Sequence, residues 1–121
     1  MPASTPKRAP KHTDRRRRRH PRYSADFRVT VSHLLESRYQ TLEGHCRDLS
    51  QAGIGLLLAA DLNGGEVVDL SFSLPGSALP WEVRGVVRYR SGYQYGFEFL
   101  SLTSEQQQSL MSRFQGLEAV D

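Results

Sequence analysis

The sequence predicts an all-β domain, an antiparallel barrel or sandwich, with one helix at its C-terminal end. Five or six short apolar stretches follow one another at a spacing of about 8 to 12 residues, separated by turn residues. No helical periodicity lies between them, so a parallel sheet with crossover helices is not favoured. The chain has 121 residues, 38% of them hydrophobic, which is enough for one domain with a modest core but not for two.

Alternating apolar and polar residues mark the first expected strand. Phe27, Val29 and Val31 alternate with polar neighbours, and this period of two is typical of a strand with one buried face. The last expected strand likewise has Tyr93, Tyr95, Phe97 and Phe99 on one face. The other strands are apolar stretches bounded by turn residues. We expect strands at about 25–33, 39–47, 54–60, 67–72, 81–89 and 93–100.

A glycine-rich connection separates the third and fourth of these strands. Asn63, Gly64 and Gly65 are residue types that adopt a positive φ in tight turns. They lie between the apolar runs 56–58 and 67–72. We therefore expect the third and fourth strands to pair as a β-hairpin.

The end of the chain carries the one helical pattern. Thr103, followed three residues later by Gln106, fits a capping box that begins a helix. We expect this helix over 103–115, closing the end or side of the sheet structure. One face of it carries residues at helical spacing: Gln107, Leu110, Met111 and Phe114.

Charge divides the chain into two unequal parts. The formal net charge of +3 comes from 16 basic and 13 acidic residues. Residues 1–22 hold nine of the basic residues and one acid, Asp14, a net charge of +8, so the remaining chain carries −5. We expect a mildly acidic globule with a basic N-terminal segment that meets an anion.

Composition excludes several classes of protein. No apolar run approaches the about 20 residues needed to cross a bilayer, so no membrane span is expected. No apolar segment follows the N-terminal basic residues, so we expect no secretory signal and a cytoplasmic location. A single cysteine, Cys46, excludes an internal disulfide.

Neither a metal centre nor catalytic machinery is expected. The histidines show no paired ligand spacing, and the adjacent His45 and Cys46 would point to opposite faces of a strand. Ser50 lies in no nucleophile elbow, and the Gly-Ile-Gly at 53–55 lacks the third glycine of a dinucleotide-binding loop. We therefore expect a binding protein rather than an enzyme.

The arginine run at 15–19 is the strongest single feature. Its first residues need no partner, because most cationic runs are solvated and disordered. Pro21 stiffens the backbone just before the first strand, so Arg17, Arg18 and Arg22 are held near the globule. There their paired donors can bind phosphates or the acceptors of guanine. The pattern alone leaves DNA, RNA, an anionic membrane and a nucleotide open as partners.

A second motif narrows this choice. Asp48-x-Ser50-x-x-Gly53 lies in a turn between two strands, and in isolation it is typical of an Asx or Ser turn. Together with the upstream Arg-Arg-x-x-x-Arg pattern, it resembles the PilZ domain family. The resemblance runs from about residue 17 to 114 and includes the late Tyr-Gly-Phe-Glu-Phe strand at 95–99.

The resemblance implies a six-stranded antiparallel β-barrel with a C-terminal helix, acting as a receptor for the bacterial second messenger cyclic di-GMP. It also implies a layout for the chain. The PilZ-like domain would span 15–118, after a basic tail at 1–14 whose prolines, small polar residues and lack of large apolar side chains predict disorder. Within the domain we expect an arginine-rich, ligand-binding strap at 15–23, the barrel at 25–101 and the helix at 103–115.

Six ligand-binding residues are carried over from the family by matching its motifs. The arginines would contact phosphates and guanine edges, Asp48 and Ser50 would be polar partners on the barrel, and Gly53 would permit the turn and close approach of the ligand. No metal or further cofactor is implied. The six are Arg17, Arg18, Arg22, Asp48, Ser50 and Gly53.

Several alternatives stay open. The first arginine pair can slide within 15–19, and we favour Arg18 and Arg22 as its core. An arginine plane, Tyr89 or Trp81 could stack on a guanine, although for Trp81 we favour packing over stacking. The runner-up function is a PilZ-like protein interaction module that binds no nucleotide, and nucleic-acid binding through the basic tail is less favoured. In the main hypothesis, ligand binding orders the strap and signals to an unknown downstream protein.

Overall fold

The computed structural model describes residues 21–74, 79–114 and 119–120. The expected tail at 1–14 and the strap residues before 21 lie outside this part of the chain. So does the predicted domain boundary at 118. The C-terminal helix ends at Ser112, before the expected end at 115. No helix within the described ranges is long and apolar enough to cross a membrane.

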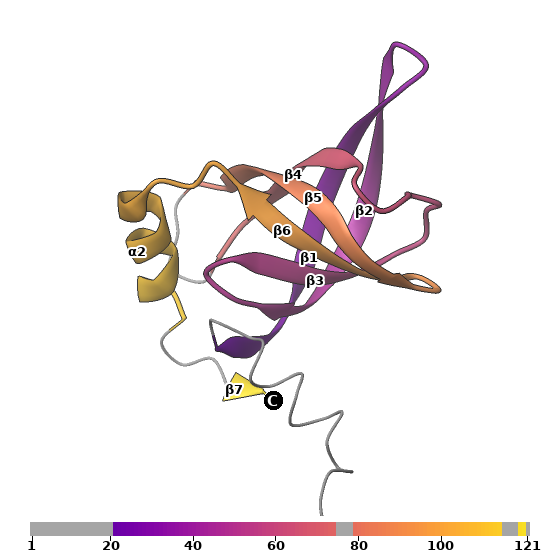
Figure 1. Ribbon diagram of the computed structural model, residues 1–121. Coiled ribbons are helices and arrows are strands. Elements are labelled where there is room, and N and C mark those ends of the chain that lie inside the picture. Colours follow the sequence, from indigo (N-terminus) through magenta and orange to yellow (C-terminus); the bar gives the residue numbers. More distant parts are fainter. Residues whose placement is uncertain (1–20, 75–78, 115–118, 121) are drawn as a thin grey trace, which may run out of the picture.

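Six antiparallel strands form a closed barrel, with a helix beside one end of it (Figure 1). The strand order is β2-β3-β6-β5-β4-β1, and β1 closes the barrel by pairing with β2. This confirms the predicted six-stranded barrel with a C-terminal helix. The strands are β1 (Arg22–Leu35), β2 (Arg38–Leu49), β3 (Gly53–Leu58), β4 (Val67–Phe72), β5 (Trp81–Ser91) and β6 (Gln94–Leu100), and they are followed by α2 (Ser104–Ser112).

The first strand begins earlier than its alternation pattern suggested. Tyr23 already pairs with Leu49 of β2. A short strand that was not predicted, β7 (Ala119–Val120), pairs with β1 at Arg22 and Tyr23. Two residues are too few to produce a sequence pattern, so only the tertiary pairing reveals β7.

The predicted hairpin between the third and fourth strands is wrong. β3 pairs with β2 and β6, whereas β4 pairs with β1 and β5. Gly65 does adopt a positive φ of 89°, but the connection crosses to β5 instead of turning back. There the Gly65 N–H donates to the carbonyl of Val87, and the Val87 N–H donates to the carbonyl of Glu66. These bonds to β5 take the place of a hairpin ladder.

Inward-facing apolar side chains fill the barrel. On β6, Tyr95, Phe97 and Phe99 are all buried, as the alternation predicted, whereas Tyr93 precedes the strand and is exposed. On β1 and β2, Val29, Val31 and Cys46 are fully buried, and His45 beside Cys46 faces solvent. The core therefore lies inside a single closed sheet.

The helix begins as predicted. The Thr103 side chain accepts from the Gln106 N–H, and the Gln106 side chain accepts from the Thr103 N–H, which completes the capping box. Leu110 and Phe114 are buried, but Met111 of the expected apolar face remains 47% exposed. The ring of Phe114 lies 4.9 Å from that of Tyr23, so the helix end packs against the start of β1.

Candidate ligand-binding site

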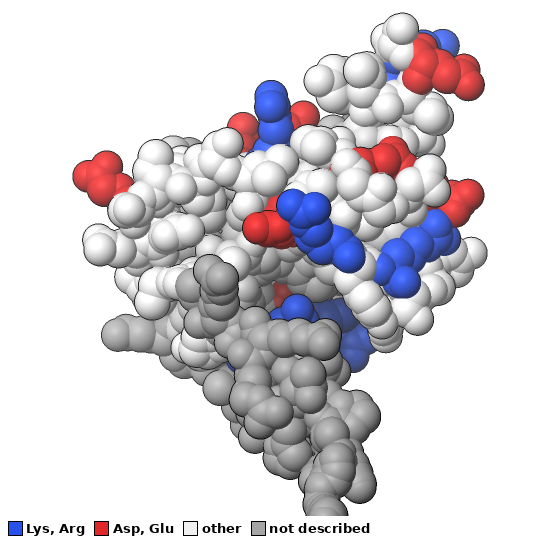
Figure 2. Space-filling view, viewed as in Figure 1, with Lys and Arg blue, Asp and Glu red and all other residues white. Residues whose placement is uncertain are grey.

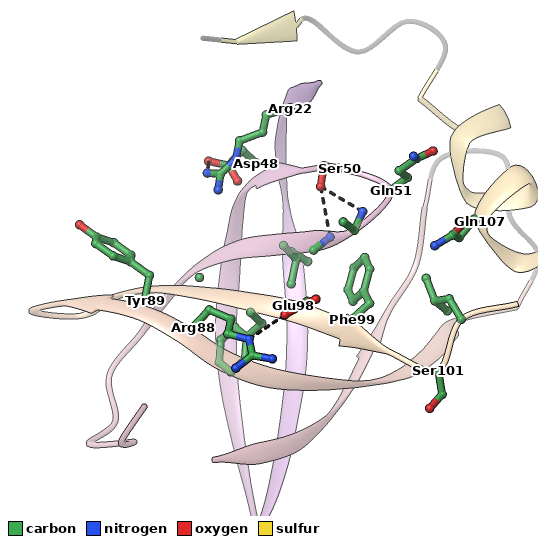
Figure 3. Close-up of a pocket in the computed structure, with 16 residues that line it drawn as sticks. Arg22, Asp48, Ser50, Gln51, Arg88, Tyr89, Glu98, Phe99, Ser101 and Gln107 are labelled. Atoms are coloured by element: carbon green, nitrogen blue, oxygen red, sulfur yellow. Dashed lines mark hydrogen bonds and ion pairs between the residues drawn. The ribbon is translucent and has the colours of Figure 1, made fainter. Parts of the chain in front are cut away.

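A pocket of about 580 Å³ lies on the outside of the barrel, between the β2–β3 turn and the start of α2 (Figure 3). Its walls come from the start of β1, from the β2–β3 turn, from β5 and β6, and from the segment leading into α2. Four predicted site residues line it together: Arg22, Asp48, Ser50 and Gly53. The remaining two, Arg17 and Arg18, lie outside the described residues.

The ion pair between Arg22 and Asp48 forms one side of the pocket. Their closest atoms, Arg22 Nη1 and Asp48 Oδ2, are 3.5 Å apart, and the two side chains are 43% and 27% exposed. Both groups are therefore reachable from solvent. At this separation the pair leaves donors on the guanidinium and lone pairs on the carboxylate for a third group.

A β-bulge at Arg47 points Asp48 outward. Cys46 pairs with Leu56 and Asp48 pairs with Gly55, so Arg47 is an extra residue on β2. The inserted residue reverses the alternation, because Cys46 and Leu49 both face the core while Asp48 faces the pocket. In an unbroken strand Asp48 would share the buried face of Cys46.

Ser50 holds the β2–β3 turn together. Its Oγ accepts from the backbone N–H groups of Ala52 and Gly53, both at 3.1 Å, and the Ser50 N–H donates to the Gly53 carbonyl. The hydroxyl oxygen is thus committed to the turn. What Ser50 can still offer a ligand is its hydroxyl proton.

Gly53 and Gly96 line the floor of the pocket, and Gly55 pairs with Gly96 beside it. A Cβ on Gly53 would lie 2.3 Å from the carbonyl oxygen of Phe97, so this glycine permits close approach of β6 rather than a left-handed turn. A Cβ on Gly55 would lie 2.6 Å from Asp48 Oδ1. Gly55 therefore makes room for the carboxylate that leans over it.

One row of paired residues joins Asp48 to Tyr89, both of which line the pocket. Asp48 of β2 pairs with Gly55 of β3, Gly55 pairs with Gly96 of β6, and Gly96 pairs with Tyr89 of β5. A Cβ on Gly96 would lie 3.3 Å from the Tyr89 Cβ, so the tyrosine leans over this glycine just as Asp48 leans over Gly55. Two bare glycines thus lie between a carboxylate and an exposed aromatic ring.

A second bulge, at Arg88, brings Tyr89 to the pocket. Val87 pairs with Phe97 and Tyr89 pairs with Gly96, which leaves Arg88 as the extra residue on β5. Arg88 Nε donates to Glu98 Oε1 at 2.6 Å, and both residues line the pocket. Sequence reasoning named Tyr89 as a possible stacking residue but missed Arg88 and Glu98, because a bulge leaves no mark in a pattern of period two.

The other aromatic candidate has a different position. Trp81 pairs with Phe72 and packs, partly buried, against the core, and it does not line this pocket. From the helix, Gln107 lines the pocket. Amide groups thus extend the polar wall toward α2.

Reactive groups are few near the pocket. Burial raises the pKa of the Cys46 thiol well above its usual range, and the neighbouring Asp48 carboxylate adds to the shift. The described ranges contain no group of three or more His, Cys, Asp or Glu residues arranged to hold a metal ion. Within these ranges the pocket therefore offers ion pairs, hydrogen-bonding groups and a ring rather than a thiolate nucleophile.

Comparison with protein families gives one match that spans most of the chain. The model of the PilZ domain matches residues 16–114. A search of the curated proteins gives no match.

Three solved structures illustrate the shared fold. The PilZ domain of CeSA from a cellulose-synthesizing bacterium has a TM-score of 0.60 and 20% identity, over 78% of this chain and 95% of that one. The PilZ domain with c-di-GMP of YcgR from Escherichia coli has a TM-score of 0.60 and 21% identity, over 81% and 88%. The inhibitor of motility MotI/DgrA from Bacillus subtilis has a TM-score of 0.63 and 24% identity, over 79% and 48%.

Proposed function

This chain belongs to the PilZ domain family, and we propose that it is a receptor for cyclic di-GMP. The observation that carries the proposal is the meeting of both predicted motifs at one pocket. Arg22 ends the arginine motif, Asp48 begins the second motif, and their side chains form an ion pair at the pocket edge. One solved structure of similar fold is a PilZ domain described with c-di-GMP, which supports the same ligand.

The groups around the pocket suit a ligand with two phosphates and two guanines. Arg22 can donate two N–H bonds to phosphate oxygens, and Asp48 can accept from the amino and imino groups of guanine. The Tyr89 ring, 58% exposed beside the glycine floor, offers a stacking surface for a base. Each part of the ligand therefore has a partner of matching chemistry.

The N-terminal strap supplies the charge that the barrel lacks in this proposal. The described residues that line the pocket include two arginines and two carboxylates, Arg22 and Arg88 with Asp48 and Glu98, so these walls are close to neutral. Basic and acidic side chains also lie close together on the face seen in Figure 2. A ligand with two negative charges would then draw in Arg17 and Arg18, and ordering of the strap would present a new surface to a downstream protein.

The role we propose is binding and signalling rather than catalysis, in the bacterial cytoplasm where this second messenger acts. Isothermal titration calorimetry tests it directly. We expect the wild type to bind cyclic di-GMP with a Kd of about 1 µM or below, a free energy near −8 kcal/mol. Asp48→Ala should weaken binding at least about tenfold, because hydrogen bonds to a charged group contribute about 1.5 to 3 kcal/mol.

Asp69→Ala is the matched control. Asp69 is also a carboxylate on an outer strand face, paired with Arg84 at 3.7 Å, but it does not line this pocket. The affinity of this variant for cyclic di-GMP should equal that of the wild type. Absence of binding by the wild type would favour an interaction module that binds no nucleotide. Equal affinities in Asp48→Ala and wild type would remove Asp48 from the site.

A further inference from the structure

A second ion pair lines the same pocket on the side away from Arg22. Arg88 of β5 pairs with Glu98 of β6, whereas Arg22 and Asp48 belong to β1 and β2 (Figure 3). In the sheet β3 lies between these two pairs of strands. The pocket therefore has one arginine on each side of its glycine floor.

The bulge in β5 gives Arg88 its position. Because it is the extra residue between Val87 and Tyr89, the inward–outward alternation of the strand does not determine which way its side chain points. Its side chain is 61% exposed and lines the pocket together with that of Tyr89. Bulges commonly re-aim side chains in this way beside binding sites.

Glu98 fixes which donors of Arg88 remain free. The Nε–H of Arg88 donates to Glu98 Oε1, and among the described residues Nη1 and Nη2 form no hydrogen bond or ion pair. A guanidinium held by its Nε edge presents the other two nitrogens end-on as a fork. That fork matches the two non-bridging oxygens of a phosphodiester.

A cyclic dinucleotide carries two phosphodiesters, set on opposite sides of its ring. In the proposed site Arg22 would bind one of them, and Arg88 is the one other arginine among the described residues that line the pocket. We propose that Arg88 binds the second phosphate and that Glu98 is the positioning residue that orients its guanidinium. This inference rests on the proposed function, because it takes cyclic di-GMP as the ligand.

Calorimetry with cyclic di-GMP tests this assignment against a matched control on the same strand. Arg84 of β5 is likewise exposed and ion-paired, with Asp69, but it does not line the pocket. Arg88→Ala should weaken binding about 10- to 100-fold, while Arg84→Ala should leave the affinity unchanged. Exposed ion pairs add little to stability, so both variants should fold like the wild type in thermal unfolding.

Two conservative variants distinguish direct phosphate binding by Arg88 from the positioning role of Glu98. Arg88→Lys keeps the charge but loses the fork, so it should recover part of the affinity lost in Arg88→Ala. Glu98→Gln keeps the shape and an acceptor oxygen but loses the charge, so it should weaken binding several-fold. A purely structural role for the pair would give no such recovery by lysine.

Phosphorus NMR of the bound ligand supplies an independent readout. The wild type should show two distinct phosphate resonances, and Arg88→Ala should shift one of them toward its position in the free ligand. If the wild type binds but Arg88→Ala binds equally well with both resonances unmoved, the assignment of Arg88 is wrong and the receptor proposal stands. If the wild type does not bind cyclic di-GMP, the receptor proposal falls, and this inference falls with it.

Discussion

Two arginine–aspartate pairs in this barrel differ in how many of their hydrogen-bond donors the fold uses. Arg90 bonds to the Asp61 carboxylate at 2.5 Å, to the carbonyls of Leu62 and Gly92, and lies over the Tyr95 ring at 5.1 Å. The side chain of Arg22 forms the 3.5 Å ion pair with Asp48 and no other ion pair or hydrogen bond with a described residue. The donors of Arg90 are thus used by the fold, whereas the described residues leave most donors of Arg22 unused.

Under the proposed function, the Arg22–Asp48 pair can serve as a binding site because its donors are incompletely used. The Asp61 hydrogen bond, the largest cause, raises the pKa of Arg90, which favours its charged form. Around it the buried hydroxyl of Tyr95 donates to the Ala60 carbonyl at 2.6 Å and accepts from the Leu62 N–H at 3.0 Å. This network holds the β3–β4 connection, and we expect its loss to alter stability but not ligand affinity.

The largest expected effect comes from Tyr95→Phe. The change leaves the buried Leu62 N–H and Ala60 carbonyl without the hydroxyl, which should lower the free energy of unfolding by about 2 to 3 kcal/mol. Urea denaturation followed by tryptophan fluorescence measures this. Affinity for cyclic di-GMP should stay at the wild-type value, and an equally large loss of affinity would mean that the two regions are not separable.

Arg22→Ala should show the reverse behaviour. Removing a charged donor from the phosphate should weaken binding about 10- to 100-fold, near 1.4 to 2.8 kcal/mol. Because its ion pair is partly exposed, the free energy of unfolding should change by less than about 1 kcal/mol. Titration calorimetry and urea denaturation of the same preparation check both values. Lost stability with unchanged affinity would make Arg22 a structural residue like Arg90.

Gly55→Ala should have a smaller effect on the site. The added Cβ would lie 2.6 Å from Asp48 Oδ1, so the carboxylate must move away from the pocket floor. A carboxylate at the end of a side chain can shift at little cost, so we expect a several-fold loss of affinity with stability lowered by about 1 kcal/mol or less.

Gly64→Ala is the control for this change. Its Cβ would meet nothing within 4 Å, so affinity and stability should stay close to the wild type. Titration calorimetry of both variants gives the comparison. Wild-type affinity in Gly55→Ala would show that the position of Asp48 does not matter for binding.

The smallest expected effect is a pH dependence from Cys46. Because burial raises the pKa of its thiol in the folded state, the unfolded chain loses this proton first as the pH rises above the ordinary value of 9.0. Folding stability should then decrease by at most about 1.4 kcal/mol per pH unit above pH 9. Urea denaturation at pH 8 and pH 10 should show a smaller decrease in Cys46→Ala. An identical decrease in both proteins would contradict the burial argument.

Local patterns predicted the elements of this fold well. Alternation on β6 anticipated the buried Tyr95, Phe97 and Phe99, and the Thr103 capping box anticipated the start of α2. These features depend on residues close in sequence. The β3–β4 hairpin failed because Gly65 sets a local φ but does not choose the partner strand. Here the partner was set by long-range bonds to Val87.

The candidate site was only partly predictable. The motif resemblance led to Arg22, Asp48, Ser50 and Gly53, and these four do line one pocket, although their contact with a ligand stays a prediction. Arg88 has no motif and owes its place to a bulge, which arises from the pairing of β5 with β6. The motifs therefore predicted four residues of the candidate site, whereas Arg88 could be proposed only from the sheet register.

Strand β7 has a consequence for observing the site. Arg22 directs its side chain to the pocket, while its backbone pairs with Val120, and Tyr23 next to it pairs with Ala119. Hydrogen exchange at these backbone amides would therefore report how firmly Arg22 is held, with no probe introduced into the pocket. Slower exchange at 119–120 on adding ligand would measure how much of the pocket is occupied, although these amides lie nearly a hundred positions after Arg22 in the sequence.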